Sequence, residues 1–155
     1  GIVGAPSLWQ TLDSLKRVYP YNVTVSAGDN FGGSYFYNAT HGVLLPVLFN
    51  DLGIRISSVG NHEFDDGQTS LADKWRHSPF RPKGWDITYV SSNVRSTETG
   101  AVPPFAQPVA TTTLMLPGSK PFKIAFVGLI ASSTPQQATT PQCSIQCLHC
   151  QWERK

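Results

Sequence analysis

Charged residues are scarce in this chain of 155 residues. Asp, Glu, Lys and Arg make up 14% of it, whereas they make up about a quarter of an average globular protein. The net charge of +2 comes with no basic run, which argues against a surface for a nucleic acid polymer. No apolar stretch approaches the roughly 18 residues that a membrane span requires. What remains is the composition of a globular protein with a hydrophobic core.

Cysteine is absent from the main body and occurs only as Cys143, Cys147 and Cys150. The main body therefore has no disulfide framework. A structural zinc site normally needs four ligands in two spaced pairs, and a second pair is missing here. We interpret residues 1–134 as one partial domain. Residues 135–155, rich in Gln, Thr and Pro, are interpreted as an irregular or disordered tail whose cysteines have no function.

Two N-glycosylation triplets begin at Asn22 and Asn38. Such triplets also arise by chance, but they are used only in proteins that are exported. They favour a location outside the cytoplasm, in which the protein is secreted, periplasmic or on the cell surface.

Segments with helical spacing alternate with short strand-like runs up to residue 90. The helices are expected at residues 7–19, 34–52 and 69–77, and the strands at residues 23–27, 54–59 and 85–90. Ser7 is the expected cap of the first helix, and Pro46 is expected to break or kink the second. The alternation predicts an α/β fold with a mostly parallel sheet covered by helices. Two later strands, at residues 109–116 and 122–130, are expected to form a hairpin that adds antiparallel strands to the sheet.

Two of the predicted strands end in a glycine that polar residues follow. Gly28-Asp29-Asn30 comes after the first strand and Gly60-Asn61-His62-Glu63 after the second. In a parallel sheet both turns open at one edge, so Asp29 and Asn61 are expected to approach each other. An Asp carboxylate can bridge two divalent cations, and an Asn carboxamide oxygen is a neutral ligand. The pair is typical of a two-metal site, although the second turn by itself is equally compatible with a hydrated polar turn.

His62 is expected to face the same cleft as these two side chains. Asp65 lies three residues further on, close enough in a tight turn to accept a hydrogen bond from the imidazole. Such a carboxylate fixes the tautomer of the ring and stabilises its charged form. A His–Asp pair beside two metals suits transfer of a phosphoryl group to water, with His62 stabilising charge or protonating the leaving group.

At these residues the chain resembles a known family. Residues 28–34 and 60–67 look like two signature blocks of the calcineurin-like metallophosphoesterases, and the 5'-nucleotidase branch is the most similar. The similarity extends to about residue 130, with supporting matches at residues 91–94 and 127–130. The resemblance implies a partial four-layer α/β/β/α sandwich with a mixed, mostly parallel sheet. It also implies metal-dependent hydrolysis of a nucleoside 5'-monophosphate or a nucleotide sugar, in nucleotide catabolism.

The resemblance further implies a role for individual residues. Asp29 is expected to bridge two divalent metal ions (Zn, Mn, Co or similar), and Asn61 to bind one of them. His62 and Asp65 are expected to be the catalytic pair. Four other residues of the matching segments are expected to be structural or to have no metal role: Glu63, Phe64, Asp66 and Asn93.

The chain departs from the family pattern in the remaining ligands. The Asp-x-His motif expected just before Gly1 is absent from the sequence, and so are the downstream metal histidines and the domain that clamps the nucleoside. None of His41, His77 and His149 lies in a context that replaces them. We therefore expect an amino-terminal piece of a longer enzyme, which by itself holds a metal pair weakly or not at all.

Two rival interpretations remain open. One is a non-catalytic binding or truncated protein that keeps the fold without the site. The other is a related hydrolase that acts on cyclic nucleotides or dinucleotides. The small-molecule partner is a nucleotide in each enzymatic interpretation, and the sequence carries no information on the oligomeric state.

Overall fold

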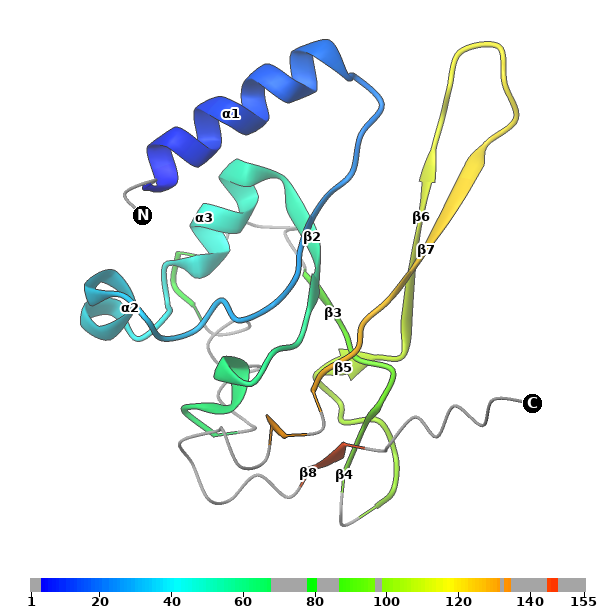
Figure 1. Cartoon of the computed structure of the whole chain (residues 1–155). Coiled ribbons are helices and arrows are strands. Elements are labelled where there is room, and N and C mark those ends of the chain that lie inside the picture. Colours follow the sequence, from blue (N-terminus) through cyan, green and yellow to red (C-terminus); the bar gives the residue numbers. More distant parts are fainter. Residues whose placement is uncertain are drawn as a thin grey trace.

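The computed structural model describes residues 4–67, 78–80, 87–96, 99–131, 133–134 and 145–147, and it has an α/β architecture (Figure 1). The helices are α1 (Ala5–Val18), α2 (Tyr35–Thr40) and α3 (Leu45–Leu52), with a 3-10 turn, η1 (His62–Phe64). The strands are β1 (Thr24–Ser26), β2 (Ile54–Ser58), β3 (Thr88–Val90), β4 (Val94–Ser96), β5 (Ala106–Gln107), β6 (Val109–Leu114), β7 (Phe122–Val127) and β8 (Ile145–Cys147).

The central sheet is parallel, as the alternation of helices and strands predicts. Its order is β1-β2-β3-β5, and each neighbouring pair runs in the same direction. Because β1 and β2 are adjacent and parallel, their carboxyl ends emerge at the same edge of the sheet. The loops that carry the two polar motifs therefore start side by side (Figure 1).

The first helix begins earlier than its sequence pattern predicts. Its N-cap is Gly4, and no side chain caps it. The expectation that Ser7 caps α1 is therefore wrong. Pro6 occupies the first turn, where its missing N–H costs nothing, and Ser7 donates its own backbone N–H to the carbonyl of Gly4 (3.0 Å).

The second predicted helix is broken into α2 and α3. The break falls at His41 and Gly42, which both have positive φ values (48° and 76°). Pro46 lies in the first turn of α3, where its ring favours a helix start. The break that Pro46 predicts is thus present, and it lies before the proline. Gly53 ends α3 in the left-handed conformation (φ 73°).

The hairpin forms as predicted, with β6 and β7 antiparallel from the pair Val109 and Val127 to the pair Leu114 and Phe122. Within the described residues, however, it is a two-stranded sheet of its own that shares no ladder with the parallel sheet, so the expectation that it adds strands to that sheet is wrong. The chain beyond β7 returns to the carboxyl end of β3, where the backbone N–H of Ser92 donates to the carbonyl of Gly128 (2.7 Å).

Several expectations fall on residues outside the described part. These are the helix at residues 69–77, the start of the strand at 85–90, and most of the tail at 135–155. Within that tail, β8 pairs with β4 in antiparallel fashion. The division of the chain at residue 134 stays a prediction.

The hydrophobic core lies between the sheet and the helices. It unites α2 and α3 with β2, β3 and the motif turn through the buried residues Phe31, Tyr37, Leu45, Phe49, Leu52, Ile54, Val59, Phe64, Tyr89, Val94 and Ile130. Phe64 is 1% exposed, and its burial in the core anchors the polar turn. Among the described helices, none has the length and apolar character to cross a membrane.

Candidate functional site

The two motif loops touch each other at their glycines. A Cβ atom added to Gly60 would lie 2.1 Å from Oδ1 of Asp29, and one added to Gly28 would lie 2.9 Å from the backbone nitrogen of Gly60. Real Cβ atoms do not approach other atoms so closely, and both positions therefore require glycine. This close approach brings the Asp29 loop against the Asn61–His62 turn.

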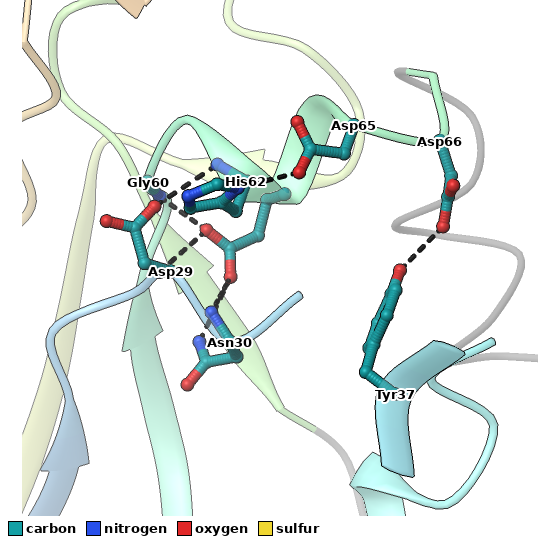
Figure 2. A network of polar contacts seen from close by, with 8 residues as sticks. Asp29, Asn30, Tyr37, Gly60, His62, Asp65 and Asp66 are labelled. Carbon is teal, nitrogen blue, oxygen red and sulfur yellow. Dashed lines mark hydrogen bonds and ion pairs between the residues drawn. The ribbon is translucent and has the colours of Figure 1, made fainter. Parts of the chain in front are cut away.

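Asp29 contacts that turn directly. Its Oδ1 atom accepts a hydrogen bond from the backbone N–H of His62 (3.1 Å; Figure 2). The residue itself has a φ of 54°, a left-handed conformation that Asp and Asn tolerate better than most residues. Asn61 immediately precedes His62 and is half-buried. The structure thus places Asp29 against the turn that contains Asn61.

His62 and Asp65 form the hydrogen-bonded pair that their spacing predicts. Nδ1 of His62 lies 2.6 Å from Oδ2 of Asp65, and the side chain of His62 is 47% exposed. The hydrogen bond to Asp65 raises the pKa of His62 above its ordinary value, against a smaller lowering by burial, and the charge of Asp29 adds to the rise. Since a carboxylate only accepts, Nδ1 carries the proton and Nε2 remains for proton transfer.

Glu63 is the buried centre of the site. Its carboxylate is 0% exposed and accepts hydrogen bonds from the backbone N–H groups of Asp29 (2.9 Å), Asn30 (2.6 Å) and Gly60 (2.6 Å). The side chain of Asn30 adds a fourth donor, with Nδ2 at 3.1 Å. A single side chain of the turn therefore binds both loops.

A second contact ties the site to α2. The hydroxyl group of the buried Tyr37 donates to Oδ2 of Asp66 (2.6 Å; Figure 2). Burial of Tyr37 and its hydrogen bond to Asp66 both raise the pKa of the phenol, so Tyr37 stays protonated and remains a donor. The ring also packs against Phe31, with the two centroids 5.5 Å apart.

The oxygen ligands that the two turns offer suit hard divalent cations, although they are only two. Asp29 and Asn61 offer carboxylate and carboxamide oxygens, which such cations accept. Within the described ranges, no group of three or more His, Cys, Asp and Glu side chains is arranged to hold a metal ion. His41 ends α2 in a left-handed conformation, and His77 and His149 lie outside the described residues.

Sequence reasoning underestimated two residues. Asn30 has no role in the sequence-based prediction, yet its side chain joins Ser26 (2.7 Å), Ser57 (3.1 Å) and Glu63 (3.1 Å). Tyr37 is predicted only as part of a helix, yet it supports Asp66. The serines inside the predicted strands are the one feature of the sequence that indicates a role for Asn30, because a buried hydroxyl group needs a hydrogen-bond partner.

Comparison with known proteins finds partial sequence similarity of the chain to a 5'-nucleotidase and a nucleotide phosphoesterase. No protein-family model matches it. It is 30% identical over 70 residues to bovine 5'-nucleotidase (Bos taurus). The aligned segment covers 45% of this chain and 12% of that protein. It is 36% identical over 62 residues to a trifunctional nucleotide phosphoesterase of Bacillus subtilis, or 40% of this chain and 4% of that protein. The matches therefore span a small part of each relative.

The fold extends the similarity over nearly the whole chain. The crystal structure of a 5'-nucleotidase precursor from Thermus thermophilus covers 95% of this chain with a TM-score of 0.74 at 22% identity. This chain corresponds to 26% of that structure. The mixed α/β architecture with its parallel sheet is thus the metallophosphatase fold.

Proposed function

Because this chain is a relative of the 5'-nucleotidases of the metallophosphoesterase family, we propose that the protein takes part in metal-dependent hydrolysis of nucleotide phosphate esters. One observation carries the proposal. Asp29 contacts the His62 turn at the carboxyl edge of two parallel strands, and His62 is paired with Asp65 in that turn. The chain matches 12% of bovine 5'-nucleotidase, and we therefore propose the activity for a protein that also contains the family's other motifs.

Asp29 and Asn61 are the proposed metal ligands of this chain. Asp29 would bridge two divalent ions such as Zn, Mn or Co, and Asn61 would bind one of them. When bound, the ions would activate water and neutralise the phosphate oxygens. The protein supplies the orientation of the ligands, because Gly28 and Gly60 let the two loops meet without side chains between them.

His62 and Asp65 are the proposed catalytic pair. Asp65 holds the proton of His62 on Nδ1, which orients the ring and favours the charged imidazolium. A charged imidazole stabilises negative charge that develops on the phosphate, and it can deliver its proton from Nε2 to the leaving oxygen. The raised pKa keeps a larger fraction of His62 protonated near neutral pH.

The proposed substrate is a nucleoside 5'-monophosphate or a nucleotide sugar. This choice rests on the named activities of the relatives, 5'-nucleotidase and nucleotide phosphoesterase. A cyclic nucleotide or dinucleotide substrate is the alternative within the same chemistry. A protein of this fold that binds nucleotides without cleaving them is the alternative outside it.

Release of phosphate by a longer version of the protein, one that contains Asp-x-His and Gly-His-x-His motifs, tests the proposal. We expect turnover of 5'-AMP with added Mn, Co or Zn and its loss in the presence of a chelator. Faster cleavage of cyclic AMP than of 5'-AMP would favour the alternative substrate. Binding of 5'-AMP without release of phosphate would overturn the hydrolase proposal.

We also propose that the protein is exported and glycosylated. Asn22 and Asn38, which open the two triplets, are both exposed, one in the loop before β1 and the other on α2. Expression in a secreting eukaryotic cell should yield a product whose mass falls on treatment with an N-glycosidase. A product of unchanged mass would contradict this part of the proposal.

A further inference from the structure

The carboxylate of Glu63 has all its acceptor positions occupied by the two motif loops. Oε1 accepts from the backbone and the side chain of Asn30, and Oε2 accepts from the backbones of Asp29 and Gly60. Three of these four donors belong to the first loop, more than thirty residues away in the chain. Glu63 therefore does more than cap the turn in which it lies.

The first loop is shaped to receive an anion. Gly28 and Asp29 both have positive φ values (95° and 54°), and the successive N–H groups of Asp29 and Asn30 converge on the carboxylate of Glu63. Concave backbone arrangements of this kind bind anions, and in many proteins the anion is a phosphate. Here an internal carboxylate fills the position, so this loop is not a phosphate site.

Asn30 connects this arrangement to the sheet. Its Oδ1 accepts from Ser26 of β1 (2.7 Å), and its Nδ2 donates to Ser57 of β2 (3.1 Å) as well as to Glu63. Ser57 is 0% exposed. The position of the Glu63 carboxylate is thus set by two adjacent strands, and the loop geometry follows from the register of the sheet.

We propose that Glu63 is a positioning residue that sets the separation and orientation of Asp29 relative to Asn61 and His62. A carboxylate without solvent exposure needs all of its hydrogen bonds, so the two loops cannot separate without exposing it. Asp29 is held in its left-handed conformation with its carboxylate against the backbone N–H of His62. The link from this geometry to metal binding rests on the proposed function.

Amide hydrogen exchange of the metal-free, isotope-labelled chain, measured by NMR, tests the proposal. In Glu63→Gln the side-chain NH2 group faces backbone donors instead of accepting from them. We expect exchange at Asp29, Asn30 and Gly60 to quicken by about tenfold or more, the effect of losing a hydrogen bond to a charged group. Exchange in the β6–β7 hairpin should change less. Equal acceleration at all core amides, or none at these three, would overturn the proposal.

Three further variants keep the test decisive. Glu63→Asp retains the charge but shortens the side chain, so it should restore protection at one loop and not at both. Asp66→Asn changes a neighbouring carboxylate of the same turn that binds Tyr37, and it should leave the three amides protected. If the Glu63 variants fail to fold, Ser57→Ala removes one partner of Asn30, and the proposal then requires faster exchange confined to Asn30 and its neighbours.

Line broadening by added Mn²⁺ separates this proposal from the proposed function. In the wild-type chain we expect broadening of the amide signals around both Asp29 and Asn61, and Glu63→Gln should need more Mn²⁺ for the same effect. Absence of broadening in the wild type would count against the metal site itself. The exchange pattern would still decide whether Glu63 positions the loops.

Discussion

Single residues in the His62 turn have separate tasks, although they are neighbours in sequence. The backbone of His62 binds Asp29, its ring binds Asp65, and the next residue, Glu63, is buried beneath both loops. The 3-10 geometry of η1 makes this possible, because successive side chains leave the turn in different directions. A polar run that looks uniform in the sequence thus contains both the exposed imidazole of His62 and the buried carboxylate of Glu63.

Replacement of His62 is the most direct test of the catalytic assignment. In a longer version of the protein with the family's remaining motifs, we expect His62→Ala to lower kcat by about 10²- to 10⁴-fold, the usual contribution of a proton-transfer group. His41→Asn is a matched control, since Asn tolerates the left-handed conformation of that exposed position. It should retain the wild-type rate. An unchanged rate in His62→Ala would sink the assignment.

The pairing of His62 with Asp65 predicts a pH dependence. The pKa of His62 is raised in the folded state, so the charged pair stabilises the fold fully below the ordinary pKa of about 6.5 and loses this contribution as the pH rises through the folded value. An NMR titration of the metal-free chain should give a pKa above that ordinary value. Asp65→Asn should lower it, and an equal pKa in both proteins would contradict the pairing.

At the level of elements, the α2–α3 break orients α2 toward the site. His41 and Gly42 take left-handed conformations, which end α2 early and bring Tyr37 into contact with Asp66. A Cβ on Gly42 would lie 2.8 Å from Cε2 of Tyr37, so the turn also packs on the tyrosine ring. The second polar contact of the site thus depends on this helix break.

Removal of the tyrosine hydroxyl tests this link between α2 and the site turn. Tyr37→Phe should lower the free energy of unfolding by about 1–2 kcal/mol, because it deletes a hydrogen bond to a carboxylate. Tyr35→Phe makes the same chemical change on the same helix at a side chain that is 89% exposed, and it should change stability by less than about 0.5 kcal/mol. Urea denaturation measures both, and equal effects would refute the link.

A glycine joins the hairpin to the parallel sheet. A Cβ on Gly128 would lie 2.1 Å from the carbonyl oxygen of Val90, so Gly128→Ala should cost about 1–3 kcal/mol or more through overpacking. Gly118→Ala is the control, since Gly118 has a φ of 68° but nothing within 4 Å of its added Cβ. It should cost about 1 kcal/mol from backbone strain alone. Thermal unfolding that ranks the two variants in the opposite order would contradict the packing.

At the scale of the whole molecule, the chain has the fold of its relatives but corresponds to only part of their length. The Thermus thermophilus structure covers 95% of this chain, while this chain corresponds to 26% of that structure. Asp29 and Asn61 are the two residues of this chain that we propose as metal ligands. Two oxygen ligands bind a divalent ion weakly, since such ions normally take four or more.

The 155-residue chain by itself is therefore expected to release negligible phosphate from 5'-AMP. The measurement is a phosphate assay with Mn, Co or Zn added in turn, with a full-length 5'-nucleotidase as the positive control. Robust turnover by this chain would show that two ligands suffice and would refute the argument from the missing motifs.

The sequence by itself determined the parallel α/β fold, the hairpin and the pairing of His62 with Asp65. These follow from local patterns: apolar periodicity, glycines at strand ends and a spacing of three residues in a tight turn. Ser7 was wrongly predicted as a cap, because a nearby proline and glycine start the helix earlier.

Only the tertiary structure decided what Glu63, Asn30 and Tyr37 do. Each binds a partner about thirty residues away in the chain, and such partners depend on strand register and helix position. Burial then determines how many hydrogen bonds such a group needs. A carboxylate on the surface is hydrated by water, whereas the same group buried beneath two loops must be fully hydrogen-bonded by the protein. The sequence thus contains the site as two separate motifs. Their loops come into contact only because β1 and β2 are adjacent in the folded sheet.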